Sequence, residues 1–218
     1  MQSTHTPNRP GRQSDQTAAR TKEAIVGAAL SEFAEHGFEG ASLRTIAQRA
    51  GTTHGLIRHH FGSKEEVFRA CVDQAMRVYG HGEKSIIQGL SAQQLSDPRA
   101  LIEAHKEIMR NFARVSAQNP LFMRILLHEG GKQSERLNYI YQQVELLNAQ
   151  HQQFFSHLMK TGALRQFDPN SCFLFILLNL GLAFGLSAVS SHFLGGNILD
   201  QAHVEAHIER ILQTLYPS

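Results

Sequence analysis

The sequence predicts an all-α fold, and two observations lead to this expectation. Apolar residues recur at the three- and four-residue spacing of helices along most of the 218 residues. The polar stretches do not alternate with apolar residues in the two-residue period of a half-buried strand. Glycine and proline residues divide the chain into about nine helices, which we expect to form a smaller N-terminal domain and a larger second domain. The composition, with 42% hydrophobic residues, is ordinary for a globular protein.

The first helix carries one apolar stripe and is expected to end at Gly37, where a left-handed residue is favoured. The stripe consists of Ile25, Ala28, Ala29, Phe33 and Ala34. Residues 1–18, rich in Gln, Ser, Thr, Pro and Arg, have no apolar run. We therefore expect a disordered basic arm there, and no signal peptide.

Residues 42–61 predict a helix-turn-helix. The first helix of the pair has a single buried face, formed by Leu43, Ile46, Ala47 and Ala50. Gly51 allows a sharp turn, and Thr52 or Thr53 can cap the next helix. That second helix has an apolar edge of Leu56, Ile57 and Phe61, with His54, Arg58, His59 and His60 on its other side. An apolar edge that holds the helix and a projecting face of hydrogen-bond donors together indicate a DNA-binding regulator.

The remaining helices are located by their caps. Residues 63–66 form a capping box that opens a helix through Met76, and glycines at 80, 82 and 89 suggest a looser connection beyond it. We place the domain boundary near Val78, which gives domains at residues 19–79 and 80–218. Helices are expected to begin at each Asp-Pro or Asn-Pro pair, near residues 97, 119 and 168, with others at about 134–160 and 200–215.

The N-terminal region resembles the TetR family of bacterial transcriptional regulators. The resemblance covers roughly residues 19–79 and is carried by short matching segments. These are residues 25–29, 36–38, 43–47, 50–51, 55–57, 60–61 and 63–66, together with Phe33. It implies a three-helix DNA-binding domain followed by a divergent helical domain that dimerises and holds a small-molecule pocket. The chain departs from the family at Arg58 and His59, where aromatic residues are frequent, so the operator cannot be inferred from a relative.

The resemblance implies eight DNA-contacting positions. These are Arg44, Thr53, His54, Gly55, Arg58, His59, His60 and Lys64. Arg58 can pair with guanine O6 and N7, whereas Arg44 and Lys64 are expected to contact phosphates. Gly55 would allow close approach of the sugar-phosphate chain, although it can equally relieve crowding between helices. Residues 1–64 hold eight Lys/Arg and five Asp/Glu, an excess of basic residues that weakly supports nucleic-acid binding.

The histidines do not predict a metal site or an enzyme. Adjacent helical positions such as His59 and His60 point apart, and no carboxylate or thiol near them in the sequence completes a ligand set. The chain lacks the G-x-S-x-G, H-E-x-x-H and clustered-carboxylate patterns of common hydrolases, so we expect no catalytic residue and no cofactor. Imidazoles that bond phosphate should bind it more strongly when charged, which predicts tighter operator binding at pH 6 than at pH 8.

The second domain is expected to bind an unidentified, largely apolar effector. Candidate pocket residues are Met109, Phe112, Phe122, Tyr139, Phe154 and Asn179. Large apolar residues at helical spacing are more often plain core, and that alternative stays open. Cys71 and Cys172 are far apart and are expected to be buried free thiols.

Residues 172–189 form a nearly unbroken apolar run that contains Gly181 and Gly185. Its length meets the criterion for a membrane span, and a membrane-anchored binding protein is one alternative function, as a small histidine-dependent enzyme is another. Asn179 within the run and the lack of flanking Lys/Arg clusters favour a buried helix in a cytoplasmic protein. We expect a homodimer through residues 169–194 and 200–216, with the two glycines allowing close approach across the twofold axis.

Overall fold

The fold is all-α, as the sequence predicts. The computed structural model describes residues 10–160 and 169–216, and these contain twelve α-helices and one π-helical segment. The expected number of about nine is too low, mainly because one expected apolar helix is divided into several segments. The chain forms two compact units, residues 1–71 and 72–218.

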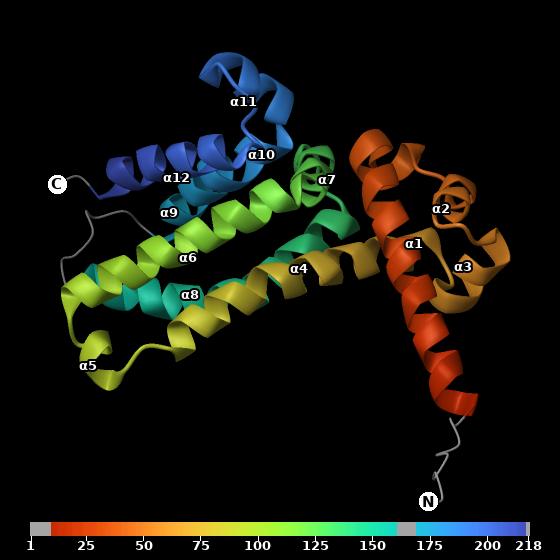
Figure 1. Ribbon diagram of the computed structural model, residues 1–218, viewed down its shortest axis with the longest axis horizontal. Coiled ribbons are helices and arrows are strands. Elements are labelled where there is room, and N and C mark those ends of the chain that lie inside the picture. The colour runs from red at the N-terminus through yellow and green to blue at the C-terminus, as the bar shows by residue number, and fades with distance from the viewer. Residues whose placement is uncertain (1–9, 161–168, 217–218) are drawn as a thin grey trace, which may run out of the picture. The chain divides into compact units, whose positions relative to one another are not determined.

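The N-terminal unit contains α1 (Pro10–Gly40), α2 (Leu43–Arg49), α3 (His54–Phe61) and the start of α4 (Lys64–Gln88) (Figure 1). Its centre is an aromatic cluster in which the rings of Phe33, Phe38 and Phe68 lie 5.4 to 5.7 Å apart. Gly37 has a φ of 66° inside α1 and Gly51 a φ of 63° between α2 and α3, so both glycines adopt the positive φ expected of them.

The start of α1 differs from the expected arm. Residues 10–18 belong to the helix, while residues 1–9 lie outside the described residues. Ala18 and Ala19 are strong helix formers, and a helix already nucleated by the apolar stripe from Ile25 onward can extend through them. The lack of an apolar stripe in residues 1–18 therefore did not predict where α1 begins.

Helix α4 runs through the position at which the domain boundary is expected. Val67, Phe68 and Cys71 are buried in the N-terminal unit, whereas Tyr79 is buried in the C-terminal unit. Gly82 also lies inside the helix. A Cβ at this position would come within 2.4 Å of the Asn111 side chain. This glycine therefore serves close packing of α4 on α6 and does not mark a loop.

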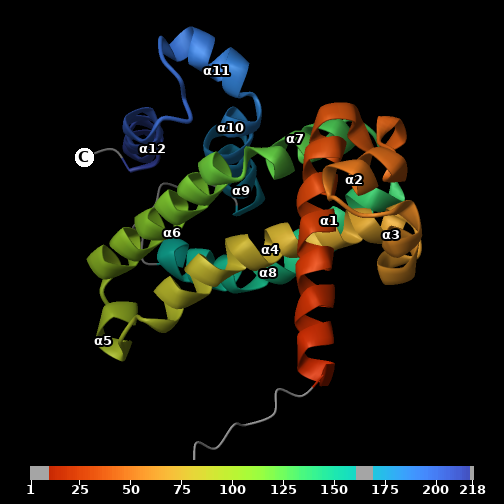
Figure 2. The same ribbon diagram turned by 45° about the vertical axis from the view of Figure 1, so that its right-hand side comes forward.

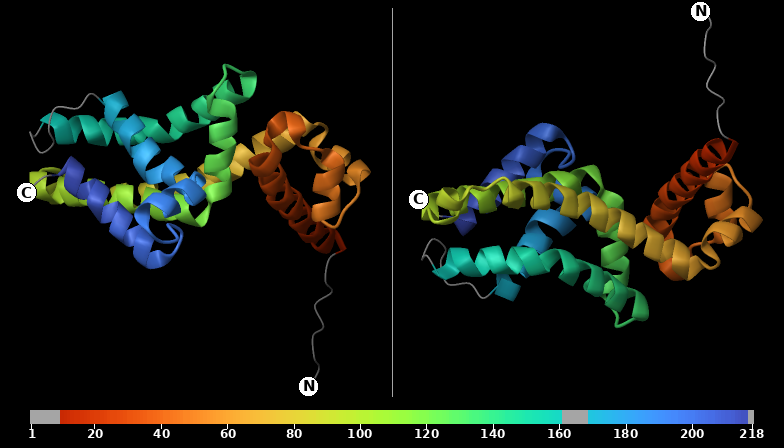
Figure 3. Two further views of the ribbon diagram at one scale, coloured as in Figure 1. Left: turned by 90° about the horizontal axis from the view of Figure 1, so that it is seen from above. Right: turned by 90° about the horizontal axis from the view of Figure 1, so that it is seen from below.

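The C-terminal unit is built around α6 (Pro98–Gln118). Short α5 (Ala92–Leu95) connects α4 to it, and α7 (Pro120–Gly130) follows and leads to α8 (Glu135–Lys160). Seen from above, α7 crosses between α6 and α8 (Figure 3). The starts of α6 and α7 follow the expected proline signals: Asp97 Oδ1 accepts from the Arg99 amide at 3.0 Å, and Pro98 and Pro120 open the two helices.

The apolar run expected to form one helix is instead segmented. It comprises α9 (Pro169–Ile176), the π-helix η1 (Leu177–Leu182), α10 (Ala183–Gly185) and α11 (Ser187–Leu194). The chain bends by 96° at Leu186, so α11 projects away from α9 and α10 (Figure 2). Arg124 Nε and Nη2 approach Gly185 O and Ser187 Oγ, at 3.3 and 3.4 Å, and fasten both sides of the bend to α7. In the part of the chain that the structure describes, no single helix is long and apolar enough to span a membrane, and only this bent pair passes that test of length and composition.

The two glycines of this run pack within the chain. A Cβ on Gly185 would lie 2.8 Å from Met123 Cβ, and one on Gly181 would lie 3.1 Å from the Phe112 ring. Both glycines thus bring the segment close to α6 and α7, so packing within the chain already accounts for them. The π-turn adds residues to the helical repeat and rotates the following side chains away from the faces that a 3.6-residue period assigns.

Helix α12 (Gln201–Leu215) closes the unit against α6. Its buried residues Val204, Ile208 and Leu212 join the core that includes α6 and α9–α10. At the edge of this contact, Arg114 forms a bidentate ion pair with Glu205, at 2.8 and 2.9 Å. Buried His105 of α6 hydrogen-bonds the Tyr216 hydroxyl just beyond α12. The last helix is thereby fixed at its end as well as along its apolar stripe.

Candidate functional site

Helix α3 presents most of the expected DNA-contacting residues on one exposed surface, the α3 face. Thr53 Oγ1 caps the helix by accepting from the Leu56 amide at 3.2 Å, and fully buried Ile57 anchors it. The exposed residues of this face are Thr53, His54, Gly55, Arg58 and His59, with His60 half-buried. The short helix is therefore held by one side and capped at its start, with hydrogen-bond donors on the other side.

Gly55 has room around it within the protein. A Cβ at this position would meet only the Thr53 hydroxyl, at an ordinary contact distance of 3.9 Å. Crowding between helices therefore does not require glycine at residue 55. A small residue on this exposed surface would allow a partner such as a sugar-phosphate chain to approach closely.

Helix α2 is tied to α1 by an acidic residue that the sequence analysis did not select. Ser42 caps α2 by accepting from the Arg44 and Thr45 amides, and the Ser42 amide in turn donates to Glu32 Oε1 at 3.2 Å. Glu32 is only 2% exposed. Its position could have indicated this role from the sequence. Glu32 lies seven residues after Ile25, on the apolar stripe of α1, and a carboxylate buried there must have a partner.

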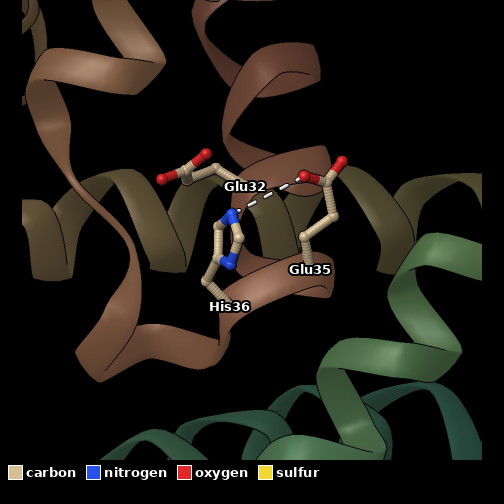
Figure 4. Close-up of side chains that lie close together, drawn as sticks. All are labelled: Glu32, Glu35 and His36. Carbon is tan, nitrogen blue, oxygen red and sulfur yellow. Dashed lines mark ion pairs between the residues drawn. The ribbon is translucent and has the colours of Figure 1, made fainter.

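Glu32, Glu35 and His36 form a cluster on α1 whose ligand atoms lie within 4.8 Å of one another, a spacing that a metal ion could use (Figure 4). In the structure Arg49 already faces these carboxylates. It holds Glu35 bidentately at 2.7 and 3.0 Å, and its Nε lies 3.6 Å from Glu32 Oε2. An arginine fork neutralises the charges that would attract a cation, so this cluster acts as a clamp between α1 and α2.

Lys64 and Arg44 have different surroundings, although both are expected phosphate contacts. The Lys64 ammonium donates to Ala41 O at 2.7 Å and lies 4.5 Å from the centre of the Phe38 ring. Arg44, near the start of α2, is exposed, and its backbone amide donates to Ser42 Oγ at 3.2 Å. Lys64 therefore ties the start of α4 to the α1–α2 turn, whereas the Arg44 guanidinium points to solvent.

The C-terminal unit contains a largely apolar cavity between α4, α6, α7, α8 and α9. It has an empty volume of about 960 Å³, counting its open mouth. Met109, Phe112 and Phe122, three of the expected pocket residues, line it. Its other lining residues are Met76, Tyr79, Glu83, Ile108, Asn111, Met123, Leu126, Ile140, Tyr141, Val144, Phe173, Ile176 and Leu177.

The other three expected pocket residues lie elsewhere. The Tyr139 hydroxyl donates to Asp73 at 2.6 Å on an outer groove between α4 and α8. Phe154 is buried in the core near His105. Asn179 donates to Phe175 O, while its own carbonyl accepts from His207 Nε2 at 2.7 Å, which satisfies the backbone of the π-helix.

The two thiols are buried, as expected. Cys71 is 1% exposed and Cys172 2%. Burial raises the pKa of the Cys71 thiol well above its usual range, and its Sγ lies 3.7 Å from Val26 O, the acceptor of a weak hydrogen bond. A thiol kept protonated in this way is a poor nucleophile and acts as a core side chain.

Comparisons with known proteins assign the N-terminal unit to a family. Residues 25–71 match the model of the bacterial regulatory proteins of the tetR family. The transcriptional repressor AcnR of Corynebacterium efficiens is 35% identical over 80 residues, 36% of this chain and 42% of AcnR. The regulatory protein RaaS of Mycobacterium tuberculosis is 49% identical over 63 residues, 28% of this chain and 27% of RaaS. The matched segments thus span less than half the length of these relatives.

The solved structures extend the likeness to the fold of both units. The ketosteroid transcriptional regulator KstR2 of Mycobacterium tuberculosis superposes with a TM-score of 0.67 at 17% identity, covering 90% of this chain and 95% of KstR2. The fold matches that of this regulator, and α2 and α3 form a helix-turn-helix. In sequence, the match to the tetR family of bacterial regulatory proteins is confined to residues 25–71 of the N-terminal unit.

Proposed function

We propose that this protein is a transcriptional repressor that binds an inverted-repeat operator as a homodimer and is released by a small, largely apolar effector. The observation that carries the DNA-binding part is the α3 face, where buried Ile57 holds a helix whose other side exposes Arg58, His54 and His59. The matched relatives are regulators, and AcnR is named a repressor. Two such helices, related by a twofold axis, would enter successive major grooves.

The homodimer is supported by a second exposed surface, the α11 face. Large apolar side chains that are 38–81% exposed gather on α9 to α11, and Phe193 is the most exposed of them. They are Leu174, Leu178, Leu186, Val189, Phe193 and Leu194. Exposed large apolar side chains gathered on neighbouring segments suit an interaction site, and a second copy of the chain is the partner that an inverted-repeat operator requires.

The proposed release rests on the apolar cavity. A ligand there contacts α4, α6, α7, α8 and α9 together, and α4 also contributes Val67 and Phe68 to the core of the N-terminal unit. A ligand that favours one position of α4 would change the population of DNA-competent dimers, provided that it binds the two states with different affinity.

The test is selection of bound DNA from a random pool, followed by titration of the selected sequence with variants. We expect an inverted repeat to be enriched. Arg58→Ala should lower affinity for it by about tenfold to a hundredfold, because one bidentate guanine contact contributes about 1–3 kcal/mol. Arg99→Ala, which removes an exposed arginine from α6, is the matched control and should bind normally. Unchanged affinity of Arg58→Ala, with an unchanged melting temperature, would contradict this site.

A further inference from the structure

The cavity of the C-terminal unit has a charge pattern that limits the chemical class of its ligand. Glu83 is the one charged residue among the described residues that line it. Glu83 lies one turn after Tyr79 and two turns after Met76 on α4, and these two residues line the cavity as well. The Glu83 carboxylate is thus placed at the edge of an apolar enclosure, where water screens its charge less than at an open surface.

The aromatic rings that line the cavity also favour a positively charged ligand. Five of the lining residues are aromatic, and the Tyr79 ring lies 5.4 Å from Phe112 and 6.1 Å from Phe122, measured between centroids. The faces of such rings carry partial negative charge and attract cations. The Tyr79 hydroxyl faces Ser116 at 3.3 Å, which leaves its ring as the part available to a ligand.

Among the described residues that line this cavity, a ligand with an anionic head would find no counterion. Lys, Arg and His are absent from its described lining, so a carboxylate or phosphate would lose its hydration and face Glu83. The basic residues of this region, Arg77, His81 and Lys84, line the outer groove between α4 and α8 instead. The apolar lining therefore suits the apolar part of a ligand, and the Glu83 carboxylate suits a positively charged group on the same ligand.

We propose that the ligand of this cavity is a lipophilic cation, an apolar body carrying one ammonium group that lies among the aromatic rings beside Glu83. The assignment rests on the proposed function in taking this cavity as the effector site. The apolar body occupies the space lined by Ile108, Met109, Met123 and Leu177, and the Asn111 side chain supplies an additional polar contact. Recognition by charge makes the class of the ligand testable without knowing its natural identity.

The experiment compares three probes that share one alkyl chain: decyltrimethylammonium, decanol and decanoate. Binding to the full-length protein is measured by isothermal titration calorimetry at neutral pH, below the micelle concentrations. We expect the cation to bind about tenfold or more tightly than decanol, with decanoate the weakest, because cation–π contacts and a partly desolvated carboxylate favour only the cation. Equal or tighter binding of decanoate would overturn the proposal.

Two isosteric substitutions locate the effect. Glu83→Gln should lower the affinity for the cation by about tenfold and leave decanol binding within about twofold, as loss of a single partly buried charge predicts. Glu145→Gln removes the same charge from an exposed position on α8 and should preserve the order of the probes. If Glu83→Gln retains the full preference for the cation, Glu83 is not the recognition group and the proposal fails. The ranking by the unsubstituted protein stands as a test even if a variant is unstable.

DNA binding without any probe is measured in parallel, so that the two proposals can fail separately. Operator binding combined with a preference for decanoate would overturn the ligand class and leave the regulator intact. Preference for the cation without binding to any sequence in a random pool would support the cavity assignment and contradict the regulator.

Discussion

Helices α3 and α11 are each eight residues long, and each leaves a large exposed surface, yet the two surfaces differ in chemistry. The α3 face carries an arginine and histidines around an exposed glycine, and Ile57 on the other side of the helix is fully buried. On α11 no residue is buried, and Val189 and Phe193 are 53% and 81% exposed. A polar face with a buried anchor suits a hydrated polyanion, whereas an apolar face without one suits contact with another protein surface.

The difference also shows where each helix obtains its stability. Helix α3 is capped by Thr53 and held by Ile57, so its conformation is stabilised within the protein and does not depend on a partner. Helix α11 has no side-chain cap at its start and follows a bend held by Arg124. We therefore expect substitutions on α3 to change binding while the fold persists, and substitutions on α11 to change assembly.

The largest expected effect comes from placing a charge on the α11 face. Val189→Asp should dissociate the dimer, because an unpaired carboxylate would be buried in an apolar interface at a cost of several kcal/mol, on the order of hundredfold or more in the dimer equilibrium. Operator affinity should fall with it, since one α3 helix cannot span two half-sites. Sedimentation equilibrium and operator titration measure the two effects.

Val78→Asp is the matched control for this prediction, because Val78 is also exposed, by 41%, but lies on α4 away from the α11 face. It should leave the oligomeric state unchanged. A dimer of normal strength in Val189→Asp would show that the α11 face is covered by something other than a second copy, and the comparison with α3 would then have to be restated.

A second prediction concerns the glycines that precede α11. Gly185→Ala should destabilise the protein by about 1–3 kcal/mol, because the added methyl overlaps Met123, whose Cβ would be 2.8 Å away. Thermal unfolding measures this. Gly130→Ala, where no atom lies within 4 Å of the added methyl, should be neutral or slightly stabilising. If Gly185→Ala instead weakened only the dimer, the glycines would belong to the α11 face after all.

Substitutions of Lys64 and Arg44 test how far the proposed DNA-contacting surface extends beyond the α3 face. Lys64→Ala should lower stability by about 1 kcal/mol, through loss of the hydrogen bond to Ala41 O, with little further effect on operator affinity per folded molecule. Arg44→Ala should leave the melting temperature unchanged and reduce the salt dependence of operator binding by about one phosphate contact. The opposite assignment of the two effects would place Lys64, and not Arg44, on the DNA.

The N-terminal unit could be predicted in detail because its signals are local. The cap at Thr53, one of the two threonines expected, the turn at Gly51 and the anchor at Ile57 each follow from a few neighbouring residues. The capping box at residues 63–66 is half as expected: the Glu66 amide donates to Ser63 Oγ at 3.2 Å, but the Ser63 amide donates to Phe61 O instead of to Glu66. Local residues thus predicted where α4 begins, whereas the turn before it determines that the Ser63 amide donates to Phe61 O.

The cavity could be predicted only in part, because its lining comes from elements as far apart in the sequence as α4 and η1. The α6 and α7 residues Met109, Phe112 and Phe122 were recognisable as large apolar groups at helical spacing. Glu83 was missed because α4 continues past the glycines that suggested a loop. Asn179 was misplaced for a different reason: in a π-helix its side chain returns to the carbonyl of Phe175. Long-range packing and a change of helical period are not visible in a local pattern.

The smallest expected effect is the pH dependence of operator binding through the α3 face. His54 and His59 are exposed there, and His60 is half-buried with its ring 5.4 Å from that of His59. Protonation adds positive charge beside the proposed phosphate contacts, so affinity should rise by about threefold to tenfold from pH 8 to pH 6 at fixed salt. His59→Gln should reduce the dependence, whereas His128→Gln, an exposed histidine on α7, should not. Equal affinities at the two pH values would remove the imidazoles from the interface and leave Arg58 and Arg44 as its charged contacts.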